Sequence, residues 1–322
     1  MSYFKEREAI TLKKLEQVRA NLPPIAHRFF LGIAQRTSPL TRLNYAYDLR
    51  MFFNFLSENV EHIHGMRIID IKEHQVESIV EQDIELFMEW LAREHGNSDQ
   101  AIMRKVATLR SFFKYMFKMK MISKNILPNV DMPKIRTNAI ERLEPNEVKR
   151  LLSEVGHLRD YTILLTLLST GIRVSELVGL NIGDIDLKNK TMRITRKGGE
   201  GAILYLSDEL QEGLEYWILT LDEKDLDPDE PLFKNHHKRR LGVRAIQIMV
   251  KENAEAITPL KKITPHKLRS TYGTTVYRKT GDIYIVADLL GHKDVNTTKK
   301  HYAAISEDRR KEIAKNINLF ED

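Results

Sequence analysis

The sequence contains no cysteine, which excludes disulfide bonds, thiolate metal sites and a cysteine nucleophile. Long apolar runs are also missing, because the longest, Tyr161–Leu168, is too short to cross a bilayer. We find no glycine-rich phosphate-binding loop of the P-loop type. The first residues, Met1–Glu6, carry charges where a signal peptide needs an apolar core. We therefore expect a cytoplasmic protein that does not enter a membrane.

Basic residues exceed acidic residues only moderately, 51 against 45, which gives a formal charge of +6. An excess of this size indicates a polyanionic partner only where the basic residues cluster. A chain of 322 residues with 42% hydrophobic residues is long enough for two domains, each with its own core.

The first 37 residues show helical spacing of apolar side chains on both sides of a proline pair. These side chains are Leu12, Leu15, Val18 and Leu22 before Pro23-Pro24, and Ile25, Phe29, Phe30 and Ile33 after it. We interpret residues 1–37 as an N-terminal helical extension that packs on the next domain, in preference to a separate binding module.

Residues 38–128 read as an all-helical domain. Ser38-Pro39 is a typical helix start, and Asp83 is predicted to cap a helix over Ile84–Arg93. The helix over Ala101–Lys120 has one apolar stripe, and its other face carries only basic charges: Arg104, Lys105, Arg110, Lys114, Lys118 and Lys120. Because a solvated face usually mixes both signs, we predict that this face contacts a DNA backbone. Residues 129–142 contain Pro133 and no sustained periodicity, and are the predicted linker.

Residues 143–322 form the second predicted domain. It begins with helices, of which one ends at Gly171, and then changes to a period of two between Asp184 and Leu206. Lys197-Gly198-Gly199-Glu200-Gly201 is predicted to turn an antiparallel hairpin. A basic loop follows at Lys234–Arg240, with Lys238, Arg239 and Arg240 ahead of Arg244. The predicted fold class is mainly α with a small antiparallel β-sheet.

The stretch from Thr264 to Tyr302 contains His266, Arg269, His292 and Tyr302. A tyrosine hydroxyl can act as a covalent nucleophile where charge on the opposite group is stabilised. Arginine side chains grip a phosphodiester well, and histidines exchange protons near neutral pH. These residue types together indicate attack of Tyr302 on a DNA phosphate.

The order of these motifs resembles the tyrosine recombinases, which are the phage-integrase and Xer-type enzymes. The matching segments are Thr170–Leu177, the hairpin lysine, His266-x-x-Arg269, Leu290-Gly291-His292 and the tyrosine. Over residues 38–310 the resemblance implies a two-domain, C-shaped clamp. It would consist of a helical core-binding domain and a mixed α/β catalytic domain.

The resemblance also implies the role of each site residue. Arg173 and Arg269 would clamp the scissile phosphate, and Lys197 would protonate the departing 5′ oxygen. His266 would exchange a proton with the hydroxyl of Tyr302, the nucleophile, and His292 would hydrogen-bond the phosphate. Glu176 would orient an arginine or histidine, without transferring a proton.

Three features leave alternatives open. Lys197 stands beside Arg196 at the hairpin, so the sequence alone does not separate a general acid from a solvated lysine. Tyr302 follows His292 by ten residues, and family members have nine or ten, so the shorter spacing would put His301 at the site. Ser270-Thr271-Tyr272 replaces the more usual His-Thr-Phe, and we expect this to tune the activity without abolishing it.

The resemblance implies double-stranded DNA recombination sites as the partner, and no cofactor, since neither ATP nor an obligatory metal is needed. It implies a homotetramer on two duplexes, or a heterotetramer with a related recombinase, with the need for an accessory protein left open. The apolar tail over Ile305–Phe320 is expected to dock on a neighbouring protomer. We expect a nucleoid-associated enzyme of dimer resolution or of mobile-element integration and excision. The alternatives are a type IB topoisomerase and a non-catalytic DNA-binding protein of the same fold.

Overall fold

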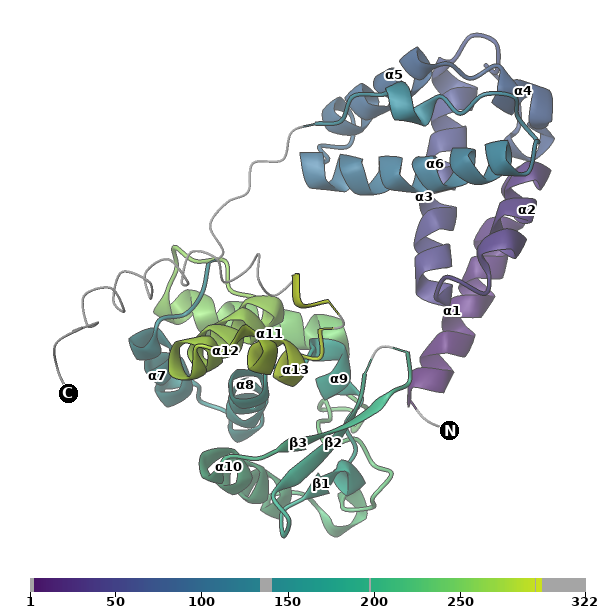
Figure 1. The fold of residues 1–322 in the computed structure, drawn as a ribbon. Coiled ribbons are helices and arrows are strands. Elements are labelled where there is room, and N and C mark those ends of the chain that lie inside the picture. The colour runs from purple at the N-terminus through teal and green to yellow at the C-terminus, as the bar shows by residue number, and fades with distance from the viewer. Residues whose placement is uncertain (1–2, 134–140, 197, 293, 297–322) are drawn as a thin grey trace, which may run out of the picture. The chain divides into compact units, whose positions relative to one another are not determined.

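The computed structural model describes residues 3–133, 141–196, 198–292 and 294–296. The chain divides into two compact units, Met1–Thr137 and Asn138–Asp322, referred to below as unit 1 and unit 2 (Figure 1). Among the described residues, no helix is long and apolar enough to span a membrane.

Unit 1 is all-helical in its described part. Its helices are α1 (Tyr3–Arg19), α2 (Pro24–Ile33), α3 (Pro39–Asn59), α4 (Glu73–Glu77), α5 (Glu81–Arg93) and α6 (Asp99–Lys118), with 3-10 turns at Ile68–Asp70 and Leu127–Asn129. The predicted start of α3 is confirmed, because Oγ of Ser38 accepts a hydrogen bond from the Thr41 N–H at 3.2 Å. The predicted break at Pro23-Pro24 is also confirmed, since it separates α1 from α2.

The core of unit 1 is built on phenylalanine rings. Helix α1 packs on α3, and α2, α3 and α5 pack on α6. The rings of Phe29, Phe53 and Phe112 meet edge to face at this junction, with centroids 5.5 Å apart for Phe29–Phe112 and 6.0 Å apart for Phe53–Phe112. Residues of α1 and α2 therefore belong to the same core as the helices that follow them.

One sequence prediction for unit 1 needs adjustment. Asp83 does not precede its helix: α5 begins two residues earlier, and Oδ2 of Asp83 reaches back to accept from the Val80 N–H at 2.9 Å. Val130, within the stretch predicted as linker, is buried in the core of unit 1 beside Ile126 and Leu127.

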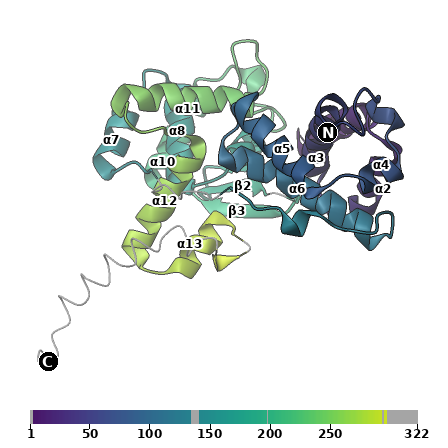
Figure 2. The same cartoon turned by 90° about the horizontal axis from the view of Figure 1, so that it is seen from above.

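Unit 2 combines helices with a small sheet. Its elements are α7 (Pro145–Glu154), α8 (Leu158–Thr170), α9 (Val174–Val178), β1 (Ile185–Asp186), β2 (Thr191–Thr195), β3 (Gly201–Tyr205), α10 (Asp208–Leu219), α11 (Val243–Ile257), α12 (Pro265–Thr280) and α13 (Ile283–Leu290), with 3-10 turns at Ile182–Asp184 and Glu223–Asp225. Helix α8 is central, since α7, α10 and α12 pack on it (Figure 2). Its residues 162–167 are all buried, so other parts of unit 2 cover this stretch on every side. The hydroxyls of Thr162 and Thr166 donate to carbonyls of the preceding turn.

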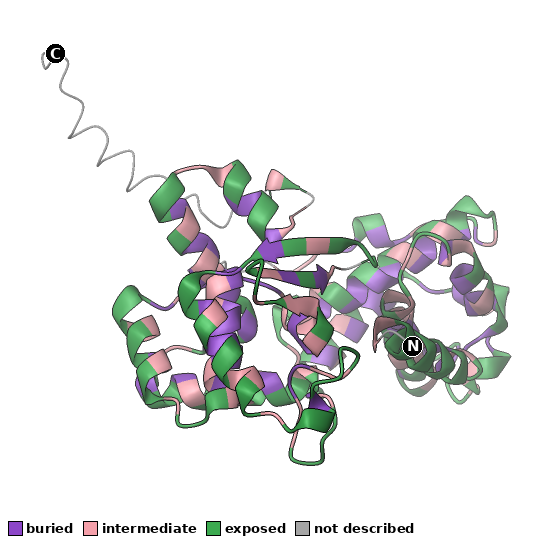
Figure 3. Ribbon diagram, turned by 90° about the horizontal axis from the view of Figure 1, so that it is seen from below, coloured by how far each residue is buried: buried purple, intermediate pink, exposed green. Residues whose placement is uncertain are grey.

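The predicted hairpin is confirmed. In the described part of the chain, β1, β2 and β3 form a three-stranded antiparallel sheet in that order. Met192 and Ile194 of β2 are buried, whereas Arg193 between them is exposed, as the period of two requires. Figure 3 colours the ribbon by burial, with buried, intermediate and exposed stretches following one another along the strands. Arg196 and Glu200 flank the turn, with the Arg196 N–H donating to the Glu200 carbonyl at 2.7 Å.

Candidate functional site

Arg269 joins three of the motif segments of unit 2: its own segment, Thr170–Leu177 and Leu290-Gly291-His292. It lies in the first half of α12 and is only 5% exposed. Its Nη1 donates to the carbonyl oxygen of Gly171 at 2.5 Å, and its Nη2 donates to the carbonyl oxygen of Leu290. Gly171 caps α8 and Leu290 ends α13, so one guanidinium holds the Arg173 segment and the His292 segment against α12.

Arg173 is fixed by a carboxylate from the next turn. It is the N-cap residue of α9, and its backbone N–H donates to Oε2 of Glu176 at 2.8 Å. Its Nη1 donates to Oε1 of the same carboxylate at 2.9 Å. The Glu176 side chain is buried while that of Arg173 is 37% exposed, so the carboxylate orients the arginine from the protein side.

The two histidines lie at helix ends near Arg269. His266 is exposed in the first turn of α12, one turn before Arg269. His292 is half-buried and follows Gly291, which ends α13 in the left-handed conformation with φ of 60°. The backbone N–H of His292 donates to the Ala287 carbonyl at 2.8 Å, which fixes the start of the segment after α13.

The departures from the family pattern at residues 270 and 272 have structural roles. Oγ of Ser270 donates to the carbonyl of His266 at 3.1 Å, within the same helix. Tyr272 packs on Gly171, where an added Cβ would lie 2.3 Å from Cδ1 of the ring. Burial raises the pKa of the Tyr272 hydroxyl above its ordinary value.

Two predicted site residues, Lys197 and Tyr302, lie outside the described residues, as does the tail over Ile305–Phe320. The described site therefore consists of Arg173, Glu176, His266, Arg269 and His292, all of which belong to unit 2. Two guanidinium groups and two imidazoles on joined segments can bind an oxyanion and exchange protons with it.

The sequence did not reveal how the start of unit 2 is bound to α12. Lys267, beside His266, donates to Oε2 of Glu141, and this hydrogen bond lowers the pKa of the Glu141 carboxyl. The Leu143 N–H donates to Oγ1 of Thr271 at 3.1 Å. These contacts hold Glu141, near the end of the predicted linker, and Leu143, directly after it, against the helix that carries His266 and Arg269. In each of these two hydrogen bonds the donor and the acceptor are more than 100 residues apart in the chain, so no local sequence pattern predicts the bond.

The basic face predicted on α6 is only partly open. Arg104 forms a bidentate ion pair with the buried carboxylate of Asp48. Its Nη1 donates to Oδ2 at 2.6 Å and its Nη2 donates to Oδ1 at 2.7 Å. Lys105 does not lie on this face: it is buried and donates from Nζ to Oδ1 of Asn97 at 2.7 Å. Burial, followed by the charge of Arg104, lowers the pKa of Lys105. Arg110 and Lys114 are exposed.

The predicted basic loop of unit 2 also divides into two kinds of residue. Lys238 pairs with Asp222 and Asp225, at 3.0 Å and 2.7 Å. Arg240 donates from Nη1 to the carbonyls of Val178 and Leu180, both at 2.8 Å, and so closes the chain after α9. Both residues are therefore engaged within the protein, and Lys238 is also exposed. Arg239 and Arg244 are exposed.

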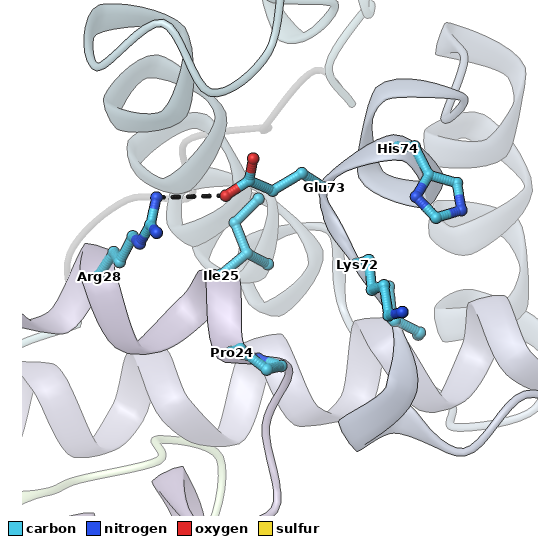
Figure 4. A pocket seen from close by; sticks show the side chains of 7 residues that line it. Pro24, Ile25, Arg28, Lys72, Glu73 and His74 are labelled. Atoms are coloured by element: carbon cyan, nitrogen blue, oxygen red, sulfur yellow. Dashed lines mark hydrogen bonds and ion pairs between the residues drawn. The ribbon is translucent and has the colours of Figure 1, made fainter.

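A surface pocket of about 340 Å³ lies in unit 1 and is lined by residues of that unit alone (Figure 4). Pro24, Ile25 and Arg28 of α2 line one side, and Ile71 to His74 line the other. Arg28 pairs across it with Glu73 at 3.2 Å. Among the described residues, no group of three or more His, Asp or Glu side chains is arranged to hold a metal ion.

Residues 141–309 match the model of the phage integrase family. The tyrosine recombinase XerC of Caldanaerobacter subterraneus subsp. tengcongensis is 31% identical over 308 residues, which cover 91% of this chain and 87% of the relative. The tyrosine recombinase XerD of Staphylococcus aureus is 32% identical over 300 residues, which cover 90% and 95%.

Solved structures share the fold. XerH site-specific recombinase bound to its difH substrate in a pre-cleavage complex aligns with a TM-score of 0.63 at 22% identity, over 89% of this chain and 82% of that one. A lambda integrase dimer bound to a COC′ core site aligns with a TM-score of 0.65 at 16% identity, over 85% and 95%. Both support the assignment of fold class made from the sequence.

Proposed function

The chain belongs to the phage integrase family of tyrosine recombinases, enzymes of site-specific DNA breaking and rejoining, and we propose that Tyr302 is its nucleophile. The Tyr302 oxygen attacks a phosphorus of the DNA backbone and forms a 3′-phosphotyrosyl bond, while the bond from phosphorus to the 5′ oxygen breaks. His266 takes the tyrosine proton, and Lys197 gives a proton to the departing 5′ oxygen. The new linkage conserves the phosphodiester, so a free 5′ hydroxyl can reverse the step on another strand.

The observation that carries this proposal is the position of Arg269. It binds the carbonyls of Gly171 and Leu290 and thereby assembles the segments of Arg173 and His292 around one buried guanidinium. In this assembly Arg173, oriented by Glu176, and Arg269 stabilise the charge that builds on the non-bridging oxygens in the transition state. His292 donates a hydrogen bond to the same phosphate.

The proposed DNA contacts outside the site are the exposed basic residues of both units. In unit 1 these are Arg104, Arg110 and Lys114, where Arg104 keeps its pairing with Asp48. In unit 2 they are Arg239 and Arg244. We leave Lys105, Lys238 and Arg240 out of these proposed contacts. The donors of Lys105 and Arg240 are engaged within the protein, and Lys238 is exposed but paired with two carboxylates. Contacts of this kind supply affinity, and bases and DNA bending supply site preference.

The domain organisation and assembly follow the family. Residues 38–128 act as the core-binding domain and residues 143–322 as the catalytic domain, joined by residues 129–142, and the two close on the duplex as a C-shaped clamp. Four protomers bind two sites and exchange strands through a Holliday junction, with the C-terminal tail docked on a neighbour. The protein acts on DNA of the nucleoid, and its relatives named XerC and XerD make a related recombinase a reasonable partner in the tetramer.

A suicide substrate tests the nucleophile. DNA trapped covalently on the protein in its native cell is sequenced to find the site, and a nicked duplex of that sequence is incubated with the full chain. The wild type is expected to accumulate a covalent adduct, and Tyr302→Phe is expected to form none, because it lacks the attacking oxygen. An adduct that persists in Tyr302→Phe would place the nucleophile elsewhere, and relaxation of supercoils without site preference would favour a type IB topoisomerase.

A further inference from the structure

The hairpin of unit 2 directs one arginine toward the site. Met192 and Ile194 are buried on the inner face of β2, and residue 196 continues that period of two. The backbone of Arg196 is fixed at the start of the turn, because its N–H donates to the Glu200 carbonyl at 2.7 Å and its carbonyl accepts from the Gly199 N–H at 3.0 Å. The side chain of Arg196 therefore leaves the strand on the core side, where it is half-buried.

The guanidinium of Arg196 lies against Gly291. A Cβ built on Gly291 would be 2.1 Å from Nη1 and 2.4 Å from Cζ of Arg196, so only glycine leaves room for this contact. Gly291 also has φ of 60°, which disfavours other residues. The position thus combines a backbone requirement with the space that an arginine from another element fills.

Two guanidinium groups contact consecutive residues at the end of α13. Arg269 donates to the carbonyl of Leu290, and Arg196 lies on Gly291, directly before His292. Carbonyls at a helix C-terminus attract cations, and Arg269 uses one of them. Within the part of the chain that the structure describes, however, the Arg196 guanidinium has neither a carboxylate partner nor a carbonyl acceptor. Two like charges held at neighbouring residues favour an anion that can bind to both.

We propose that Arg196 supplies a further guanidinium to the phosphate at which the strand is cut, beside Arg173 and Arg269. This rests on the proposed function, in which that phosphate binds at Arg269 and His292. Arg196 would then stabilise charge on a non-bridging oxygen during both cleavage and rejoining. No proton is transferred by it, because an arginine keeps its proton at any working pH.

The chain offers a matched control in Arg193. It lies on the same strand and has the same charge, but it is on the exposed face and pairs with Asp184 at 3.2 Å. On the suicide substrate, Arg196→Ala is expected to slow adduct formation by about 100-fold, the typical effect of removing one transition-state donor. Arg196→Lys should recover part of the rate, and Arg193→Ala should change it by less than about threefold, in line with an exposed ion pair. Equal losses in Arg196→Ala and Arg193→Ala would overturn the proposal, because they would reflect general attraction of DNA.

A DNA substrate with an uncharged methylphosphonate distinguishes stabilisation of charge by Arg196 from a purely structural role of this residue. When a methylphosphonate replaces the cleaved phosphate, no second negative oxygen has to be stabilised, so the deficit of Arg196→Ala relative to wild type should shrink to about threefold or less, the size expected of the exposed control. A deficit of the same size on both substrates would show that Arg196 only supports the fold of the hairpin, and would overturn the proposal.

A second measurement does not need cleavage. The Tyr302→Phe protein is treated with phenylglyoxal, which modifies arginine, with and without inorganic phosphate, and the sites are read by mass spectrometry. Phosphate should slow modification of Arg196 and leave Arg193 unchanged. If phosphate protects Arg196 but the wild-type protein forms no adduct on the suicide substrate, the proposed nucleophile is refuted and the anion contact of Arg196 stands. Adduct formation without protection of Arg196 would refute the contact alone.

Discussion

At the scale of single residues, Glu176 holds Arg173, the arginine proposed to bind the phosphate. It is buried, and both of its oxygens accept from Arg173, one from the backbone and one from the guanidinium. The first bond caps α9 and the second orients the arginine, so one side chain contributes to the fold and to the proposed site. Arg269 also does both, because its two described hydrogen bonds join three segments.

Replacing Glu176 by glutamine should separate these two tasks. The amide oxygen can still accept from the Arg173 N–H, but the charge that holds the guanidinium is lost. We expect Glu176→Gln to reduce the rate of adduct formation by about tenfold, equivalent to about 1.4 kcal/mol in the transition state, with little change in DNA affinity. The comparison of single-turnover rates with gel-shift affinities checks this. A loss confined to affinity would mean that Glu176 does not position Arg173 for chemistry.

At the scale of elements, the turn after α10 is held by one acidic group. Asp225 is buried, and Oδ2 accepts from Lys238 while Oδ1 accepts from Lys234, at 2.7 Å and 2.9 Å. The hydrogen bond from Lys238, followed by that from Lys234, lowers the pKa of Asp225 from 3.8 to about 2. Lys238, predicted from its sequence neighbours to bind DNA, is thereby used to close this loop.

The pH dependence of unfolding follows from this shift. Because the pKa is lower in the folded state, the stabilisation is fully present above the ordinary value of 3.8 and is lost as the pH falls through about 2. Urea titrations between pH 5 and pH 2 should therefore show a steeper loss of stability for the wild type than for Asp225→Asn. Parallel profiles for the two proteins would contradict the ion-paired state of Asp225.

At the scale of the whole molecule, affinity for DNA depends on which basic residues remain exposed, and much less on the formal charge of +6. Arg239 and Arg240 are neighbours of equal charge with different surroundings. Arg239 is exposed, whereas Arg240 donates to two carbonyls and, at 2.5 Å, to Oδ1 of Asn181. Substitutions of Arg239 and Arg240 therefore serve as controls for each other in measurements of DNA affinity and stability.

Salt titrations of DNA binding should distinguish these neighbours. Affinity falls as salt rises, and each phosphate contact makes the slope of log affinity against log salt steeper by about 0.9. Arg239→Ala should therefore make that slope shallower by about 1 and leave the stability of the protein unchanged. Arg240→Ala should instead lower the free energy of unfolding by about 3 kcal/mol, because carbonyls after α9 lose a charged donor. The reverse pattern would show that Arg240, and not Arg239, meets the DNA.

The sequence by itself determined the fold class, the start of α3, the hairpin and the order of Arg173, Arg269 and His292, because these depend on local periodicity and on motif residues. It left open which basic side chains face solvent. Periodicity assigned Lys105 to an open face, and only packing against Asn97 revealed it as buried. The contact of Arg196 with Gly291 and the bond of Arg269 to Gly171, 98 residues away, exist only once distant segments are packed together. The partner of a long side chain is set by tertiary geometry, which local pattern does not encode.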